Sequence, residues 1–168
     1  MTTEPNRLGF SVRGLANWIL DYADELKVQH TNMGVNKLAF FAVEFLLIQK
    51  GLLLTNAKIE AWEHGPVFRE LYQSFKGYGN GYVLGRAKSF SVGTGSFEEP
   101  TFKILSEHER LLKEALRPFM KRSAAELRAI SHRQGSAWHR VWWYDGHANP
   151  GMEITPSLLI EAYEGKSA

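Results

Sequence analysis

The sequence predicts a mainly α protein, a compact bundle of about six or seven helices with a small β-hairpin between residues ~85 and 105. Apolar residues recur at helical spacing through most of the chain, and capping residues stand where these segments begin. Six of the fifteen glycines lie between Gly77 and Gly95, where a regular helix is improbable. The 168 residues are 44% hydrophobic and 23% charged, an ordinary globular composition, so we expect one domain over residues 1–168.

The first two helices are predicted from spacing and from their ends. The first begins after Ser11, whose hydroxyl can cap it, and ends near residue 26. The second follows Thr31 or Asn32 as its cap and runs to Lys50, with Gly51 as the stop. Its apolar residues occupy nearly all sides, which predicts a central helix with neighbours on several sides.

The middle of the chain mixes short elements. Residues 52–64 are expected to be irregular or a short strand. Pro66 suits a first helical turn, which predicts a helix from there through Phe75. Residues 86–92 alternate as a strand does, and we expect them to pair with residues 102–105 after Pro100 in a small hairpin. The glycines here match no phosphate-binding motif.

Two capping boxes begin the second half, because Ser106 precedes Glu109 and Ser123 precedes Glu126. The first predicts a helix that Pro118 interrupts. The second predicts a short helix that ends near residue 132.

The last part of the chain is expected to hold two further helices. Ser136 can cap a turn or two with several tryptophans. Thr155 and Pro156 begin a last helix, 155–164, which Gly165 ends.

Composition excludes several functional classes. There is no Cys, so the chain has no disulfide, no thiolate nucleophile and no Cys-based zinc site. The six histidines match no metal-ligand spacing, and we expect no metal and no cofactor. No apolar run reaches the ~20 residues of a membrane helix, and the first residues do not resemble a signal peptide. We therefore expect a soluble, cytoplasmic protein without a membrane partner.

The net charge of +2 is unevenly distributed. Residues 1–102 are neutral, residues 103–140 hold nine basic and four acidic side chains, and residues 141–168 hold one basic and four acidic ones. Such a basic stretch is often only a solvated helix face, but it can also contact phosphates. A nucleic-acid-binding regulator that uses residues 103–140 is therefore the alternative function.

Catalysis has little support in the sequence. The densest polar group is Glu60 and Glu63 beside His64, and spacing alone does not bring them together. No nucleophile motif is present. We expect no catalytic residues and a protein that is not an enzyme.

Residues 58–76 form the most distinctive segment. Trp62, Gly65 and Pro66 can serve the fold, through core packing and a sharp change of chain direction. A rigid loop that presents Glu63 and His64 would equally suit recognition of a partner.

The second distinctive segment has four large aromatic residues in seven positions. They are Trp138, Trp142, Trp143 and Tyr144, with Arg140 among them. Trp138 and Trp142 share a helix face, so the others point elsewhere. Because interfaces favour Trp, Tyr and Arg, we expect some of these side chains to pack in the core and others to contact a partner.

The sequence resembles the Panacea antitoxin domain family, also described as SocA-like or GepA-like. Four blocks carry the resemblance in the family's order: GLANWILDYA, TNMGVNKLAFFA, IEAWEHGPVFRELYQSFKGYG and SAAELRAISHRQGSAW. The third block is the most specific. The motif-matching part covers about residues 11–140.

The resemblance implies an antitoxin that neutralises a cognate protein toxin by direct binding, and a proteolytic adaptor that delivers the toxin to an ATP-dependent protease. It names neither the toxin nor the oligomeric state. One departure lies at residues 35–40, where the family usually has Leu-Gln-Lys-Leu-Leu-Tyr and this chain has VNKLAF. The lysine, Lys37, is kept, while Phe40 lacks the tyrosine hydroxyl and any hydrogen bond through it.

The two distinctive segments and the resemblance together select the candidate residues. The candidates for partner binding are Trp62, Glu63, His64, Lys76, His132, Trp138, Trp142, Trp143 and Tyr144. The candidates for a structural role in the family motifs are Lys37, Gly65, Pro66, Tyr72 and Phe75.

Overall fold

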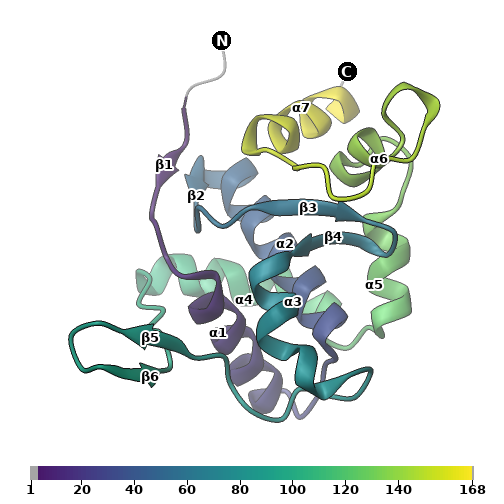
Figure 1. Cartoon of the computed structure of the whole chain (residues 1–168). Helices are drawn as coiled ribbons and strands as arrows, with labels where there is room; N and C mark the ends of the chain where they lie inside the picture. The colour runs from purple at the N-terminus through teal and green to yellow at the C-terminus, as the bar shows by residue number, and fades with distance from the viewer. Residues whose placement is uncertain (1–3, 168) are drawn as a thin grey trace.

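The computed structural model describes residues 4–167 and shows a mainly α fold (Figure 1). Its elements in chain order are β1 (Asn6–Arg7), α1 (Val12–Glu25), α2 (Asn32–Lys50), β2 (Leu52–Leu53), β3 (Ile59–Trp62), β4 (Gly65–Phe68), α3 (Arg69–Phe75), the 3-10 helix η1 (Lys76–Tyr78), β5 (Ser89–Ser91), β6 (Ser96–Glu98), α4 (Ser106–Met120), α5 (Ala124–Ser131), α6 (Ala137–Trp142), the 3-10 helix η2 (Tyr144–Gly146) and α7 (Pro156–Ser167). The predicted helical bundle and the hairpin within residues 85–105 are confirmed. No helix in the described part of the chain combines the length and apolarity that crossing a membrane requires.

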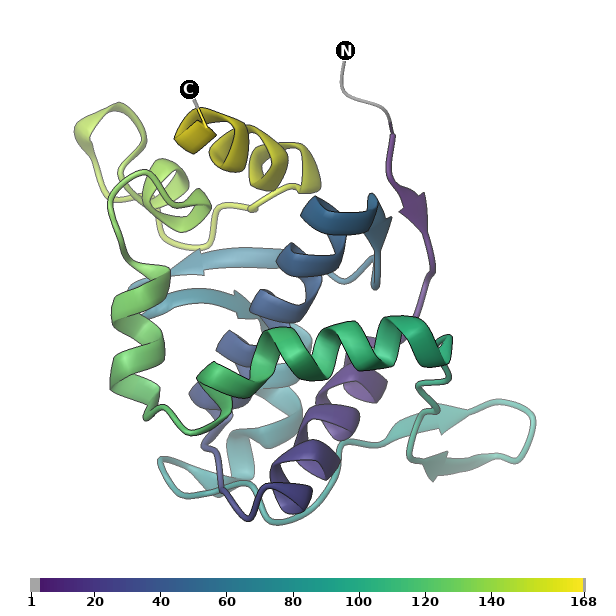
Figure 2. The ribbon, with the colours of Figure 1, turned by 180° about the vertical axis from the view of Figure 1, so that it is seen from behind.

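Helix α2 is the centre of the molecule, as its apolarity predicted. It contacts α1, α3, α4, α5, α7 and β4, and Figure 2 shows it behind α4. Thr31 caps it by accepting a hydrogen bond from the backbone N–H of Gly34 at 3.2 Å. Gly51 ends it in the left-handed region at φ 66°, a conformation that glycine adopts without steric cost.

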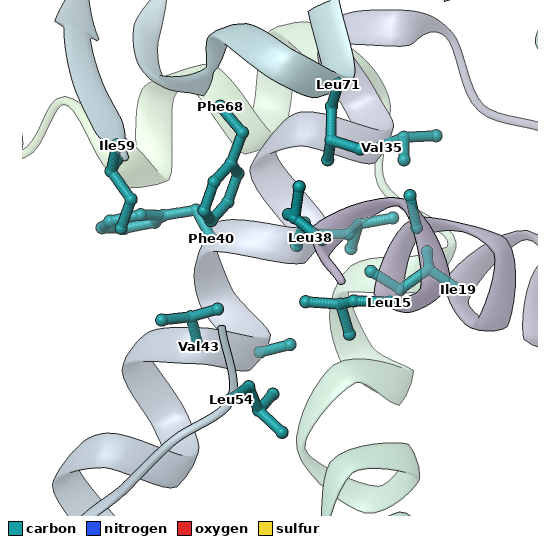
Figure 3. Packing of buried hydrophobic residues seen from close by; sticks show 14 of the residues in the cluster. Leu15, Ile19, Val35, Leu38, Phe40, Val43, Leu54, Ile59, Phe68 and Leu71 are labelled. Carbon is teal, nitrogen blue, oxygen red and sulfur yellow. The ribbon is translucent and has the colours of Figure 1, made fainter. Parts of the chain in front are cut away.

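The core lies on two sides of α2, where it packs against α1 and against β4. Figure 3 shows Leu15 and Ile19 of α1 beside Leu38 of α2, with Phe68 of β4 near Phe40. All five side chains are buried. Burying an aliphatic or Phe side chain contributes about 1.5–3 kcal/mol. The contact between Phe68 and Phe40 therefore fixes the hairpin of β3 and β4 against α2.

The β3–β4 hairpin is antiparallel, and the pair Trp62↔Gly65 closes it. The other edge of β3 is occupied by residues 151–154, since the backbone N–H of Ala61 donates to Met152 O and that of Ile154 donates to Ile59 O, both at 2.8 Å. Figure 1 shows the hairpin between α2 and the pair α6 and α7. The C-terminal part of the chain thereby reaches the β3–β4 turn.

The structure corrects two predictions for the middle of the chain. Pro66 lies in β4, and helix α3 begins only at Arg69. Ala61, the residue opposite Pro66, uses its own N–H and C=O toward residues 151–152, so the strand loses no ladder bond through the proline nitrogen. The partner of β5 is β6, at residues 96–98, and the predicted pairing with residues 102–105 is wrong.

Three predicted helix ends also differ. Leu105 is the N-cap of α4, and Ser106 is the first residue of the helix. No side chain makes a capping hydrogen bond at this end. Pro118 lies inside α4, which continues to Met120, because the bond it removes is on the exposed side near the helix end. Helix α7 continues through Gly165. The caps Ser123 and Ser136 are confirmed.

Candidate partner-binding surface

The turn between β3 and β4 presents Glu63 and His64 to solvent. Neither residue has a positive φ, because Lys27 is the one non-glycine residue with positive φ among residues 4–167. Gly65, at φ 115°, therefore takes up the change of direction. A Cβ at this position would lie 2.6 Å from Lys37 Cε and 2.7 Å from Ser131 Oγ. Both the backbone conformation and the close packing require glycine here.

Buried side chains hold the turn from behind. Lys37 is 1% exposed, and its Nζ donates to Pro66 O at 3.2 Å. Asn36 Oδ1 accepts from the backbone N–H of Phe68 at 2.9 Å. The outer edge of β4 is thus closed by side chains of α2. The ring of Phe40, at the position where the family usually has tyrosine, is buried in the core.

Burial, together with the positive charge of nearby Arg128, lowers the pKa of Lys37 to about 7. The ammonium group of Lys37 donates to a neutral acceptor, the carbonyl oxygen of Pro66. The lysine is therefore held in a site that favours its neutral form.

Helix α6 contacts the turn through Trp138. The indole Nε1 of Trp138 donates to Trp62 O at 2.7 Å, and its ring stacks on His132 with centroids 3.7 Å apart and planes 1° apart. Burial, together with the positive charges of Arg128 and Lys37, lowers the pKa of His132 to about 4. His132 is thus neutral at physiological pH, and within residues 4–167 its buried Nε2 has no hydrogen-bond partner.

Two open grooves flank the turn. The first, about 510 Å³, is lined by Glu63, Arg128, His132, Trp138, His139, Trp142, Trp143 and Ala148. The second, about 450 Å³, is lined by Trp62, Glu63, Arg69, Trp142, Pro150 and Gly151. Glu63 and Trp142 border both grooves, so the turn and α6 form one continuous concave area.

The most exposed aromatic side chains of this area follow directly after α6. Trp143 is 49% exposed and Tyr144 is 71% exposed. We call the side chains of the turn, from Trp62 to His64, and of the segment from Trp142 to Tyr144 the tryptophan surface. Its members are Trp62, Glu63, His64, Trp142, Trp143 and Tyr144.

The structure separates the predicted candidates by environment. Trp138 is buried, and His132 is half-buried beneath the groove. Lys76 lies in η1, beyond the end of α3, and lines neither groove. Of the structural candidates, Phe75 is 1% exposed, and Tyr72 packs edge-on against Trp62 at 4.9 Å.

Glu60 does not join Glu63 and His64 in a buried cluster. Its carboxylate accepts two hydrogen bonds from Arg69, both at 2.9 Å, and one from Trp62 Nε1 at 3.3 Å. The hydrogen bond from Arg69 is the main cause that lowers the pKa of Glu60. Glu60 is thus ionised and committed to an ion pair, while Glu63 and His64 are exposed. Within residues 4–167, no group of three or more His, Cys, Asp or Glu side chains could hold a metal ion.

Three polar side chains that line the grooves, Arg128, Arg69 and His139, were not among the predicted candidates. Arg128 lies one helical turn before His132, a spacing that indicates a shared face of α5. Arg69 follows β4 and reaches Trp62, with its guanidinium carbon 5.7 Å from the ring centroid. His139 lies in α6 beside Trp138. Recognising the 62–65 hairpin turn would have pointed to Arg69.

Comparison with known proteins identifies the family. The family model described as antitoxin SocA-like, Panacea domain, matches residues 35–139. The chain belongs to the SocA-like Panacea antitoxin family. It is 32% identical over 163 residues to Antitoxin SocA of Caulobacter vibrioides (strain NA1000 / CB15N), a match that covers 95% of this chain and 81% of that protein. No solved structure matches. The predicted resemblance is confirmed, and membership of this family supports an antitoxin role.

Proposed function

We propose that this SocA-like protein neutralises a cognate protein toxin by direct binding through the tryptophan surface. The single observation that carries the proposal is a concave area with exposed aromatic side chains around a turn that is held rigidly from behind. Trp and Tyr are enriched among the residues that dominate binding energies at protein interfaces. Because the turn is already fixed, little conformational entropy is lost there on binding.

The composition of the surface indicates the chemistry of the contact. Trp143 and Tyr144 offer apolar area that water covers in the free protein. Arg128 and Arg69, at the two grooves, are exposed cations, while Glu63 between them is an exposed carboxylate. An apolar centre with charged groups at its border is typical of a specific protein interface.

Binding of the purified protein to its cognate toxin tests the proposal. Trp143→Ala is expected to weaken binding by at least ~1 kcal/mol, about fivefold in Kd, without loss of folding. Tyr82→Ala is the matched control, because Tyr82 is 53% exposed and lines neither groove. Unchanged affinity in both Trp143→Ala and His64→Ala would remove the tryptophan surface from the interface.

We further propose that the complex presents the toxin to an ATP-dependent protease. Family membership supports this second step, and the exposed surface outside the grooves leaves room for a further partner. Degradation of the toxin by the purified protease should require both ATP and this protein. A toxin that is neutralised equally well in cells without the protease would show that binding alone suffices.

The alternative, nucleic-acid binding, is favoured by the cationic side chains of residues 103–140, most of which are exposed. Several of these cations are already paired with carboxylates: Arg110 with Glu114, Lys113 with Glu25, and Arg122 with Glu126. A salt titration separates the two functions. Phosphate binding weakens steeply as salt rises, whereas an apolar protein interface changes little.

A further inference from the structure

The β5–β6 hairpin carries exposed aromatic side chains far from the tryptophan surface. Phe90 and Phe97 are opposite each other in the register, with ring centroids 5.4 Å apart. They are 56% and 70% exposed, and Val92 near the tip is 90% exposed. Contiguous exposed apolar groups of this kind mark an interaction site.

The hairpin has little support from the rest of the molecule. The main contacts of β5 and β6 are with each other, and Arg13 Nη1 donates to Ser89 Oγ at the hairpin's base at 3.2 Å. A lone two-stranded hairpin is only marginally stable in water. Docking against another surface would supply the packing that the hairpin lacks.

The charge of the hairpin restricts what it can dock against. Residues 89–101 contain Glu98 and Glu99, both exposed, and the exposed Lys88 directly precedes β5, so the hairpin with this residue is acidic by one charge. The complementary surface is therefore apolar and offers a basic group.

The same chain offers such a surface elsewhere. A mainly apolar groove of about 250 Å³ lies among α2, α4, α5 and α7. Its lining includes Phe41, Phe45 and Ile48 of α2 and Phe119 of α4, and Arg133 contributes a guanidinium group. One carboxylate, Glu44, also lines it, and Arg133 is the basic residue among the lining residues.

The hairpin and the groove of one molecule are not placed to meet. Figure 2 shows the hairpin projecting beyond the end of the molecule where α4 begins. The groove adjoins the second half of α4, at Ala115 to Phe119, and is bordered by α7. The hairpin of one copy is instead free to reach the groove of another copy.

We propose that two copies of this chain form a reciprocal dimer in which the hairpin of each copy docks into the α2–α4–α5–α7 groove of the other. Phe90 and Phe97 contact the apolar lining, and Glu98 and Glu99 lie near Arg133. In this twofold arrangement both hairpins and both grooves are used, so the assembly ends at two copies. The α2–α4–α5–α7 groove shares no lining residue with the two grooves beside the tryptophan surface, so separate variants test the dimer and the toxin contact.

Sedimentation equilibrium of the full chain without toxin tests the dimer. The unmodified protein is expected to reach the dimer mass as its concentration rises. The double variant F90S/F97S is expected to dimerise at least about tenfold more weakly, as judged by the dissociation constant of the dimer. Its helical circular-dichroism spectrum should be unchanged. Leu84→Ser is the matched control, because Leu84 is 72% exposed but lies outside the hairpin and the groove, and it should leave the dimer intact.

A charge exchange identifies the groove as the docking site. Arg133→Glu alone and E98K/E99K alone should each weaken the dimer, and their combination in one chain should restore most of the affinity. A monomer at every accessible concentration, a dimer that F90S/F97S leaves unchanged, or a mass that grows beyond the dimer would each overturn the proposal. A monomeric protein whose F90S/F97S variant loses toxin binding would overturn it too and would assign the hairpin to the toxin.

Discussion

Substitution of Gly65 by Ala tests whether the β3–β4 turn is held by the packing behind it. The added methyl group meets two obstacles. The backbone of Gly65, at φ 115°, is a conformation that side chains rarely adopt. The new Cβ would also lie 2.6 Å from Lys37 Cε and 2.7 Å from Ser131 Oγ, well inside van der Waals contact. Because Lys37 and Ser131 are themselves buried, neither can move aside into solvent.

The two obstacles contribute separate free energies. A residue in a sparsely populated backbone region costs about 1–3 kcal/mol. Forcing an extra methyl group into a packed site costs about a further 1–3 kcal/mol. We therefore expect Gly65→Ala to lower the free energy of unfolding by roughly 2–6 kcal/mol, a large part of the stability of a small domain.

Gly135→Ala isolates the backbone contribution. Gly135 has φ 83°, and a Cβ there would meet no atom within 4 Å. Its cost should be only the conformational part, about 1–3 kcal/mol. Urea unfolding followed by tryptophan fluorescence measures both variants. If the two variants lose the same stability to within ~0.5 kcal/mol, Lys37 and Ser131 do not confine the turn, and the steric reasoning is refuted.

Three further predictions concern the groups around the turn. The pKa of His132 is about 4 in the folded state and ~6.5 in the unfolded chain, so the free energy of unfolding should fall as the pH drops from ~6.5 toward 4. His132→Phe should reduce that slope in urea titrations across this pH range. Lys37, with a folded pKa of about 7, should make stability rise with pH between ~7 and ~10.4, and Lys37→Met should remove this rise in the same measurement. Trp138→Phe leaves the Trp62 carbonyl without its indole donor, so unfolding should require about 1–3 kcal/mol less, and a variant as stable as the unmodified protein would contradict this role of the indole.

Sequence reasoning succeeded where local chemistry decides the structure. The hydroxyls of Ser11 and Thr31 cap α1 and α2, and Gly51 ends α2 in the left-handed conformation, all as predicted. Each of these features depends on residues within one turn of the helix end. The prediction that Pro66 begins a helix was wrong, because a proline suits a first helical turn and also a strand position that needs no N–H. The choice between these two depends on residues 151–152, which are far away in the sequence.

The candidate surface was predicted in parts but not as a whole. Trp62 and Trp138 were singled out in separate segments, yet the hydrogen bond that joins them spans 76 residues. Lys37 and Pro66, 29 residues apart, are connected in the same way. Neither periodicity nor composition encodes such a pairing, because it depends on how α2, α5 and α6 pack around the hairpin.

The structure divides the substitutions at this surface into two classes that one pair of measurements distinguishes. Glu63, His64 and Trp143 are exposed, so replacing them should change toxin affinity and leave the free energy of unfolding within about 0.5 kcal/mol. Gly65 and the side chains behind it support the turn, so their replacement should lower stability first and affinity only as a consequence. Stability from urea unfolding plotted against affinity for each variant should therefore give two separate groups. A single correlated line through all variants would mean that the exposed residues also hold the turn, and the tryptophan surface would then have no side chains dedicated to binding.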